Sequence, residues 1–355
     1  MDVNKYYIGY VINQNTIQIT PEILGLIAKI DEFKGAWRAL GTLAPNRLSA
    51  LRRVAAIDSI GASCRMAGGK LSDREVERLL SNPQIKAFTT QDEQEAAGYA
   101  EVMNWMSLCW QNISLSENHL KQLHRDLLIY SEKDAAQRGN YRTLPNPAGL
   151  VDERGVGING ASETATSRLM VELVTWMEGE RRLERLHPLL LIGLWMVSFL
   201  NIHPFQDGNA RLSRILTTLL LLQAGYPYVP YSSLESVFES DQEAYFLALA
   251  QTQATIPSDA PDWQPWLLFF LRALAEQVRR LNTKLERERL VLAPLPTLSL
   301  QLVEFAREHG RLTMSDALRL TGGNRNTLKQ HFRTLVKQGC LNQNGAGRGV
   351  WYELR

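Results

Sequence analysis

The sequence has few cysteines, almost no net charge and no apolar segment long enough to anchor it in a membrane. Only three of its 355 residues are cysteine, an odd number without paired metal-ligand spacing, which argues against a disulfide framework and a structural zinc site. Lys and Arg number 39 against 37 Asp and Glu, a formal net charge of +2, so the chain as a whole is not expected to attract nucleic acid or membranes. We expect Cys64, Cys109 and Cys340 to be buried free thiols.

The longest apolar run is PLLLIGLWMVSFL, residues 188–200. Its 13 residues are too few to cross a bilayer, which takes about 20. The N-terminus lacks the charged-then-apolar pattern of a signal peptide. We therefore expect a buried central helix at 188–200 in a cytoplasmic protein with no membrane partner.

What the sequence does contain is apolar side chains in helical periodicity. Hydrophobic residues make up 45% of the chain, enough to offset the entropy cost of folding, and the length predicts two or three domains. Helical patterns dominate and strand-like alternation is short, so the predicted fold class is mainly α. We divide the chain into an N-terminal helical region, a helical core, a long connecting helix and a small C-terminal domain, at residues 1–112, 113–260, 261–293 and 294–355.

Two segments interrupt or extend this helical pattern. The Gly- and Pro-rich stretch 139–160 has turn chemistry between short apolar pieces, as in a small hairpin or a plain surface loop. In the connecting helix, apolar residues recur at spacings of 4, 3, 4, 3 and 4 at Leu267, Leu271, Leu274, Val278, Leu281 and Leu285. This heptad-like stripe favours packing against the chain's own core, with the seam of a homodimer as the alternative.

The last segment, 294–355, has the pattern of a winged helix-turn-helix. Helices are predicted at 298–309, 314–320 and 325–338, with Asn324 as a cap of the third. A Gly-rich tip followed by Val-Trp-Tyr is typical of a wing. From residue 295 onward nine Lys and Arg face four Asp and Glu, so the basic surplus is concentrated in this domain.

Four basic residues recur every fourth position on the predicted third helix: Arg325, Lys329, Arg333 and Lys337. This spacing is typical of a face that contacts DNA phosphates or bases. An equally good interpretation is a solvated face in a domain that recognises a protein partner.

The most informative segment is HPFQDGNARLSR, His203 to Arg214, which lies between the apolar run and a second predicted helix at 212–223. Backbone N–H groups at a helix start are unpaired and carry the positive end of the helix dipole. The small residues there allow a phosphate to approach closely. They are Gly208, Asn209 and Ala210.

The side chains of this segment supply complementary chemistry. Arg211 and Arg214 are three residues apart, on one helix face, and can contact further phosphates. Asp207 is placed to hold Mg²⁺, which typically takes one or two carboxylates plus phosphate oxygens. His203 has a pKa suited to accepting a proton near neutral pH, and Phe205 is an apolar peg for the loop. Together they predict a phosphoryl- or nucleotidyl-transfer site.

The same twelve residues resemble the motif HxFx(D/E)GNxRxxR of the Fic (filamentation induced by cAMP) family of protein adenylyltransferases. Ala210 departs from the commoner Gly, and its methyl group narrows the phosphate approach. The resemblance extends over about 116–255, where GNYR at 139–142 is similar to the start of the family's flap hairpin. It implies a Fic-type helical core with a short β-hairpin flap at 113–260.

This resemblance implies that AMP passes from ATP to a Ser, Thr or Tyr hydroxyl of a target protein, possibly the chain itself, with Mg²⁺ as cofactor. By position His203 would be the base and Asp207 the Mg²⁺ ligand. The anion hole would be Gly208, Asn209 and Ala210, and the outer phosphates would be held by Arg211 and Arg214. Tyr245 resembles the position that packs on adenine, although a core aromatic residue is the alternative.

A second resemblance fails at one position. Many family members carry an inhibitory helix, (S/T)xxxE(G/N), whose Glu pairs with the last motif arginine. At 58–68, Ser63 and Gly68 fit this pattern, but Ala67 replaces the Glu. Arg214 would then have no partner there and stay free for ATP. Ala67 fits a natural relative without this brake or an engineered substitution, and the isolated departure favours the second.

Two functions follow from these observations. The leading hypothesis is a Mg²⁺- and ATP-dependent protein adenylyltransferase, de-repressed because position 67 is Ala. The alternative is a DNA-binding transcriptional regulator that uses the winged helix, with the Fic-like domain as nucleotide sensor or toxin remnant. The intact motif favours the enzyme, because a sensor has no need of His203.

Overall fold

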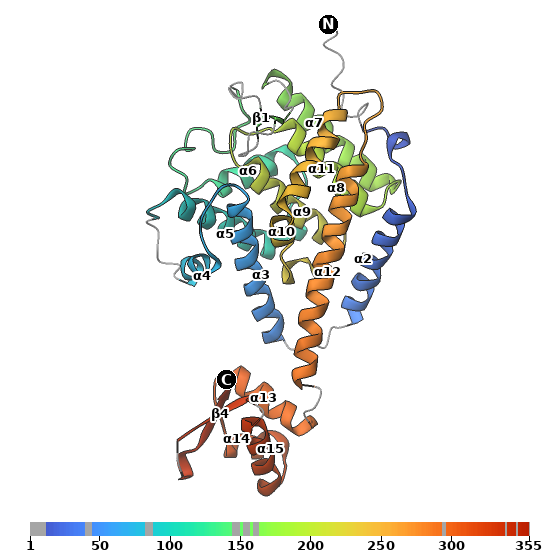
Figure 1. Cartoon of the computed structure of the whole chain (residues 1–355). Helices are drawn as coiled ribbons and strands as arrows, with labels where there is room; N and C mark the ends of the chain where they lie inside the picture. The colour runs from blue at the N-terminus through green and yellow to red at the C-terminus, as the bar shows by residue number, and fades with distance from the viewer. Residues whose placement is uncertain are drawn as a thin grey trace. The chain divides into compact units, whose positions relative to one another are not determined.

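The structure is a computed structural model that describes residues 12–39, 45–81, 88–143, 150–151, 157–158, 163–292, 296–337, 339–345 and 347–354. The chain forms two compact units, coloured along the sequence in Figure 1. One consists of Met1–Leu43 and Ala50–Arg280, and the other of Ala44–Ser49 and Leu281–Arg355. The boundaries predicted at 112, 260 and 293 stay predictions.

The first unit is built almost entirely of helices, and the predicted mainly α class is confirmed. In chain order its elements are η1 Gln14–Thr16, α2 Pro21–Ala39, α3 Pro45–Arg65, α4 Asp73–Ser81, α5 Gln91–Cys109, η2 Trp110–Asn112, α6 Glu117–Leu127, β1 Leu150–Val151, β2 Gly157–Ile158, α7 Glu163–Leu183, α8 Pro188–Ile202, α9 Asn209–Gln223, η3 Val229–Tyr231, α10 Glu235–Ser240, α11 Gln242–Thr255 and α12 Gln264–Leu292. Helix α12 continues past residue 280 into the second unit.

Helix α8 is the centre of the first unit. Every residue from Leu189 to Leu200 is buried, as expected for a helix that is apolar on all faces. It begins at Pro188, where the missing N–H costs nothing, and it packs against α7, α9 and α11. The prediction of a buried central helix at 188–200 is confirmed.

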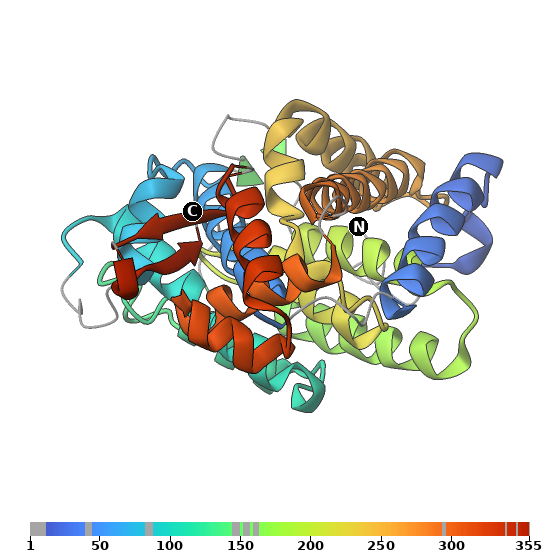
Figure 2. The ribbon, with the colours of Figure 1, turned by 90° about the horizontal axis from the view of Figure 1, so that it is seen from below.

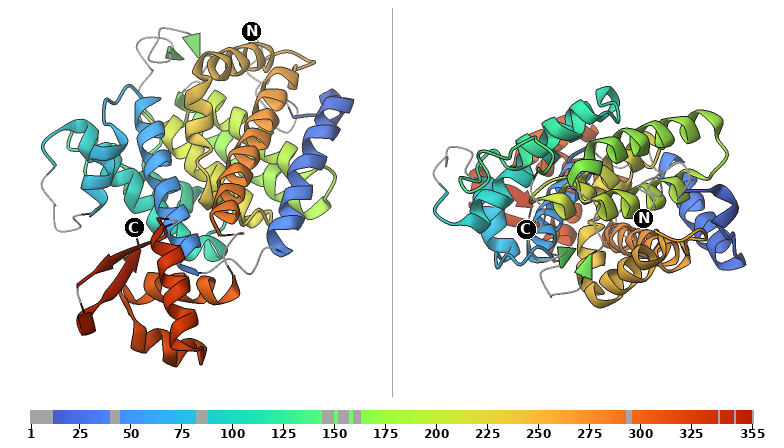
Figure 3. Two further views of the ribbon diagram at one scale, coloured as in Figure 1. Left: turned by 60° about the horizontal axis from the view of Figure 1, so that its bottom comes forward. Right: turned by 90° about the horizontal axis from the view of Figure 1, so that it is seen from above.

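Helix α12 lies beside α2, as Figures 1 and 3 show. Arg272 of α12 donates to the Glu22 carboxylate of α2, with the closer contact at 2.6 Å. On the other face, Leu267, Leu271 and Leu274 are buried within the chain. These burials agree with the prediction that the leucine stripe packs against the chain's own core.

The Gly- and Pro-rich stretch contains a short antiparallel hairpin, in agreement with the first of the two interpretations. Leu150 pairs with Ile158, and Val151 pairs with Gly157. The segment between the two strands, 152–156, where the sequence predicts a turn, lies outside the described residues. The hairpin precedes α7 in the same unit as the motif segment 203–214.

The second unit combines three helices with a three-stranded antiparallel sheet, seen from below in Figure 2. The elements after α12 are α13 Thr297–His309, β3 Leu312–Thr313, α14 Met314–Thr321, α15 Arg325–Lys337, β4 Leu341–Asn344, η4 Gly347–Gly349 and β5 Trp351–Leu354. Strand β5 lies between β3 and β4. The element order agrees with the sequence-based helices, while the classification as a winged helix stays a prediction.

Two expectations about single features can be compared with the structure. All three cysteines are free, but only Cys64 is buried, and Cys109 and Cys340 are partly exposed. The prediction that all three are buried is therefore wrong for two of them. Among the described residues, no helix has both the length and the apolar character needed to cross a membrane.

Candidate active site

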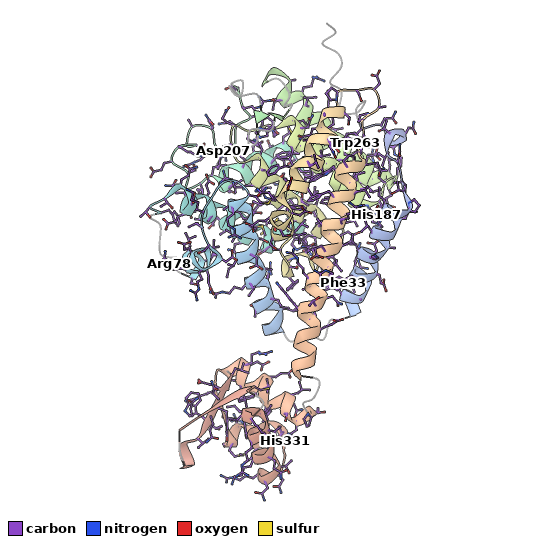
Figure 4. The ribbon with its side chains drawn as sticks, in the orientation of Figure 1. Phe33, Arg78, His187, Asp207, Trp263 and His331 are labelled. Carbon is purple, nitrogen blue, oxygen red and sulfur yellow. The ribbon has the colours of Figure 1, made fainter. Side chains whose placement is uncertain are left out.

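The motif occupies the connection between α8 and α9 and the first turns of α9. His203 ends α8 in the left-handed conformation, with φ 50°, and Gly208 precedes α9 with φ 79°. A side chain at Gly208 would be strained by that φ, so glycine is required there. In Figure 4 Asp207 of this connection lies on the side of α5 and α6, away from Phe33 of α2.

Asn209 fixes the shape of the loop and the orientation of His203. Its Oδ1 accepts from the Phe205 N–H at 2.9 Å, and its Nδ2 donates to the Phe205 carbonyl at 2.7 Å. These two bonds settle which end of the amide is the donor. The same Nδ2 lies 3.2 Å from Nδ1 of His203, so the imidazole is held by a side chain that is itself held on both sides.

The environment keeps the His203 imidazole neutral. Burial, reinforced by the Arg142 guanidinium, lowers the pKa of His203 to about 4. Arg142 also donates from Nε to the His203 carbonyl at 2.9 Å, and its backbone N–H donates to the Pro204 carbonyl at 2.9 Å. Arg142, which follows GNY in the sequence, therefore holds the start of the motif in place. Because the His203 ring is neutral, it is able to accept a proton at neutral pH.

Asp207 is an ionised carboxylate surrounded by donors. Its Oδ2 lies 2.9 Å from Lys133 Nζ, and its Oδ1 accepts from the Gly208 N–H and lies 3.2 Å from an Arg211 nitrogen. Burial alone would raise the pKa of Asp207, but Arg211, Lys133 and the Gly208 N–H outweigh it and lower the pKa to about 2. The side chain is 37% exposed, so the carboxylate remains reachable from solvent.

Arg211 is held by a second acidic residue that comes from α5. Its Nη1 lies 2.8 Å from Glu95 Oε2, and both side chains are less than 10% exposed. The other Glu95 oxygen accepts from Gln91 at 2.7 Å and lies 3.7 Å from Lys133 Nζ. Glu95 and Asp207 thus share two cations, Arg211 and Lys133, in one network.

Arg214 is buried and bound to Ser63 of α3. Its Nε donates to the Ser63 hydroxyl at 2.8 Å and its Nη2 donates to the Ser63 carbonyl at 2.9 Å. Arg214 is expected to have no partner at position 67 and to stay free for ATP; it is not free, because Ser63 binds it. The contact does place the end of α3 against the last arginine of the motif, as the resemblance to an inhibitory helix implies.

The end of α3 is anchored by further contacts to α10. Ser59 donates to the Glu235 carboxylate at 2.7 Å, and Arg65 pairs with Glu239 at 2.6 Å. Ala67 and Gly68 lie in the turn that follows the helix, where Gly68 has φ 90°. The contacts of Ser59 and Arg65 with α10 therefore hold the end of α3, and the turn that contains position 67 follows directly from it.

The N-terminus of α9 has the character expected of an anion site. The first N–H groups of a helix have no intrahelical partner. At the start of α9, Gly208 has no side chain that could cap them. Ala210 is exposed, whereas Asn209 and the residues from Arg211 to Leu222 are buried. The helix therefore meets solvent at the position where the motif has Ala instead of Gly.

Tyr245 lies in an aromatic cluster of α10, α11 and α12. It is 2% exposed, and its ring contacts those of Phe238, Trp266 and Phe269 at centroid separations of 5.2 to 5.7 Å. These contacts agree with the core-aromatic alternative. Its contact with adenine stays a prediction.

The sequence-based reasoning missed Glu95, Lys133 and His124. The His124 ring stacks on Phe205 at 3.7 Å, accepts from the Gly139 N–H at Nδ1 and lies 3.0 Å from the Asp207 carbonyl at Nε2. All three residues lie outside the motif segment, and no local pattern singles them out. For Glu95, the acid-rich start of α5, QDEQE, is a weak local signal.

The residues predicted to contact DNA or a partner lie on α15 of the second unit. Arg325, Lys329, Arg333 and Lys337 are all exposed. They follow one another every four residues along the helix, whose buried residues are Leu328, Phe332 and Leu335.

Part of this sequence is similar to a known protein family. Residues 114–221 match the Fic/DOC family. A "Protein adenylyltransferase Fic" from Culex quinquefasciatus is 26% identical over 185 residues, which cover 51% of this chain and 35% of that protein. One of the same name from Drosophila melanogaster is 32% identical over 119 residues, 34% of this chain and 22% of that protein. The chain thus spans about a third or less of the length of these relatives.

Comparison with solved structures supports the fold. A Fic family protein from Desulfovibrio desulfuricans G20 is 23% identical, with a TM-score of 0.65 over 96% of this chain and 98% of that one. A Fic domain containing signaling protein from Bacteroides thetaiotaomicron VPI-5482 is 22% identical, with a TM-score of 0.59 over 71% and 95% of the two chains. At these identities the likeness concerns the fold.

Proposed function

We propose, from the premise that residues 114–221 of this chain form a Fic domain, that the protein is a protein adenylyltransferase. It would transfer AMP from ATP to a Ser, Thr or Tyr hydroxyl of a protein. The observation that carries the proposal is the joint placement of His203, Asp207, Arg211 and Arg214 around an uncapped helix start. The names of the relatives support the same chemistry.

In the proposed reaction the hydroxyl oxygen attacks the α-phosphorus of ATP. A new bond forms between that oxygen and the α-phosphorus, the bond from the α-phosphorus to the bridging oxygen breaks, and diphosphate leaves with the electron pair. The hydroxyl proton passes to His203, which is neutral because burial lowers its pKa to about 4. Asn209 positions the imidazole before this step.

Charge on the phosphates would be stabilised by the start of α9 and by the two arginines. Unpaired N–H groups at a helix start bind phosphate oxygens, and Arg211 and Arg214 add charge-assisted hydrogen bonds. Arg211 is already oriented by Glu95 and Asp207. Arg214 has to leave Ser63, at least in part, to reach a phosphate.

The residues present fit Mg²⁺ as the implied cofactor. Asp207 is ionised and partly exposed, and Mg²⁺ typically takes one or two carboxylates with phosphate oxygens and waters. In the described part of the chain no cluster of three or more His, Cys, Asp or Glu side chains could hold a metal alone, so ATP would supply the remaining ligands. Asp207 would hold Mg²⁺, and the bound cation would supply Lewis-acid stabilisation of the phosphate charge.

We further propose that the enzyme is de-repressed. Arg214 is bound by Ser63, a neutral residue. The family's pattern has a Glu for this arginine at the position four residues later, which is Ala67 in this sequence. A hydroxyl and a carbonyl hold a guanidinium less strongly than a carboxylate does. ATP would therefore displace α3 from Arg214 more easily than it would displace a glutamate.

The central test follows label from ATP. The full chain incubated with Mg²⁺, cell lysate and ATP labelled at the α-phosphate is expected to label protein, including the chain itself. His203→Ala is expected to abolish this labelling, whereas the substitution of an exposed histidine at the end of α13, His309→Ala, is expected to preserve it. Transfer of label from the γ-phosphate would overturn the proposal, and mass spectrometry of AMP adducts would identify the acceptor residue.

De-repression is tested at position 67. Ala67→Glu is expected to lower the labelling rate about tenfold or more, because a carboxylate adds a charged contact to Arg214. Ala67→Gln has nearly the same size without the charge and is the matched control. Equal rates for the Glu and Gln variants would show that position 67 does not restrain Arg214.

A further inference from the structure

We propose that helix α15 and the β4–β5 strand pair of the second unit form a binding site for duplex DNA. This site is separate from the proposed transferase activity and uses none of its residues. Two helices joined by a short turn, followed by a two-stranded antiparallel ribbon, are elements that place one helix in the major groove of DNA. The strands and helices of this unit are visible in Figure 3, left.

The turn between α14 and α15 is built from residues that suit it. Helix α14 begins with a capping box between Thr313 and Asp316 and ends at Gly322, which has φ 61°. The Asn324 side chain then accepts from the Asn326 N–H at 2.8 Å. Both ends of the connection are thus capped, which fixes the direction in which α15 leaves the turn.

Helix α15 has one apolar face and one cationic face. Leu328, Phe332 and Leu335 are buried in the core of the unit. The exposed residues include the row Arg325, Lys329, Arg333 and Lys337. Residues four apart lie close together on a helix surface, so the four cations form one continuous stripe along the helix.

The charges of the unit are sorted by element. Helix α15 contains no Asp or Glu, and neither does the loop 345–349 between β4 and β5. The acidic residues from 295 onward lie on α13, α14 and β5 and are Glu304, Glu308, Asp316 and Glu353. Asp316 is bound by Thr313, and Glu353 accepts from Asn344 at 2.9 Å. The positive potential along α15 is therefore not cancelled by acids on the same helix.

The uncharged residues of α15 favour DNA over an acidic protein. Asn326, Thr327, Gln330 and Thr334 are exposed between the cations, and such side chains bond to phosphates and base edges. Protein interfaces are instead enriched in aromatic residues and depleted of Lys. The large apolar residues of α15 are buried or half-buried, so this face offers no apolar anchor.

The strand pair supplies a second contact region. Strands β4 and β5 pair from Leu341 and Leu354 to Asn344 and Trp351. The connection requires glycine, because Gly345 has φ 76° and a Cβ there would lie 2.5 Å from the Gly349 carbonyl oxygen. The sequence places Arg348 in this connection. From residue 339 to 350 the sequence thus has one basic and no acidic residue, which favours approach to a phosphate backbone.

The test measures binding of the full chain to a fluorescent duplex of random sequence, by anisotropy, over a range of salt concentrations. Counterion release predicts that affinity falls as salt rises, with a log–log slope of about −0.9 for each phosphate neutralised. The wild type is expected to bind at low salt with a slope of about −3. The charge reversal Lys329→Glu/Arg333→Glu is expected to weaken binding at least about tenfold and to reduce the slope by about 2.

The matched control is Arg74→Glu/Arg78→Glu on α4. These arginines have the same spacing, are also exposed and lie in the other unit. The control is expected to bind as the wild type does. Absence of binding at low salt, or equal loss in both variants, would overturn the proposal, and the latter would point to non-specific attraction. Labelling from ATP in the α15 variant is expected to stay unchanged, so failure of this site and failure of the transferase are distinguishable.

Discussion

Arg214, the last residue of the motif, donates two hydrogen bonds to Ser63, one to its hydroxyl at 2.8 Å and one to its backbone carbonyl at 2.9 Å. The carbonyls of the last helical turn lack intrahelical partners and carry the negative end of the helix dipole. The Ser63 carbonyl lacks the usual helical donor four residues later, since the Ala67 N–H donates to the Cys64 carbonyl instead. Arg214 thus caps the C-terminal end of α3. The arginine that would bind an ATP phosphate in the proposed reaction is therefore held by the neutral Ser63 and by the end of that helix.

The first prediction concerns this contact. Ser63→Ala removes the hydroxyl acceptor from a buried guanidinium, a bond worth about 1.5–3 kcal/mol. We expect tighter binding of ATP, by about tenfold, because Arg214 is released more easily. We also expect a lower melting temperature, by a few degrees. Calorimetric titration with Mg²⁺-ATP and thermal unfolding measure the two effects.

Ser59→Ala is the control for this variant. Ser59 lies one turn earlier on α3 and bonds to Glu235 instead of Arg214. It is expected to lower the melting temperature without tightening ATP binding. If both variants bind ATP equally, Ser63 does not compete with ATP for Arg214.

The second prediction concerns the Mg²⁺ requirement. Lys133 Nζ lies 2.9 Å from Asp207 Oδ2 and forms an ion pair with it. Lys133→Met therefore removes a cation that would compete with Mg²⁺ for that carboxylate. The Mg²⁺ concentration for half-maximal labelling is expected to fall several-fold. Glu95→Gln is expected to raise it, because Arg211, deprived of one acid, would pair more strongly with Asp207.

The opposite signs of these two changes make the second prediction specific. A general loss of structure would impair both variants in the same direction. Lys29→Met, an exposed lysine on α2, is the matched control and is expected to leave the Mg²⁺ requirement unchanged. A shift of the same sign in the Lys133 and Glu95 variants would show that they do not act through Asp207.

The parts of the site that could be predicted from sequence are those encoded within a few residues. The segment 203–214 contains the base, the carboxylate, the helix start and two arginines in one local pattern. Helices could also be predicted from the sequence. The helices predicted at 298–309 and 314–320 agree with α13 and α14 within one residue. In each case hydrogen bonds and burial depend on neighbours three or four residues away.

The contacts that orient those residues could not be predicted, because they join distant parts of the chain. Glu95 reaches Arg211 from α5, and Lys133 reaches Asp207 from the turn after α6. A single acidic residue at the start of a helix has several ordinary explanations, including a favourable interaction with the helix dipole. Only the packing of α5, α6 and α9 against one another distinguishes among them.

The third prediction concerns the pH dependence of the reaction. A general base must be deprotonated to act, and the pKa of His203 is lowered to about 4. The rate constant kcat/KM for ATP should therefore stay level from pH 8 to about 5.5 and fall only as the pH approaches 4. A midpoint near 6.5, the pKa of an ordinary histidine, would show that His203 is not buried in the working enzyme. Initial rates of labelling in buffers of constant ionic strength provide the profile.

The fourth prediction concerns stability and follows from His124, which is 1% exposed and whose pKa burial lowers to about 4. In the unfolded chain this histidine has a pKa near 6.5, so between pH 6.5 and 4 the unfolded state binds the extra proton and stability falls as the pH falls. From pH 7 to 5 the loss from His124 alone is about 2 kcal/mol. His124→Gln is expected to be less stable at pH 7, because it disturbs the bonds to Gly139 and Asp207, yet to lose about 2 kcal/mol less than the wild type on acidification. Urea unfolding followed by tryptophan fluorescence at the two pH values measures the difference, with His309→Gln as control, and an unchanged pH dependence in the His124 variant would contradict the neutral, buried ring.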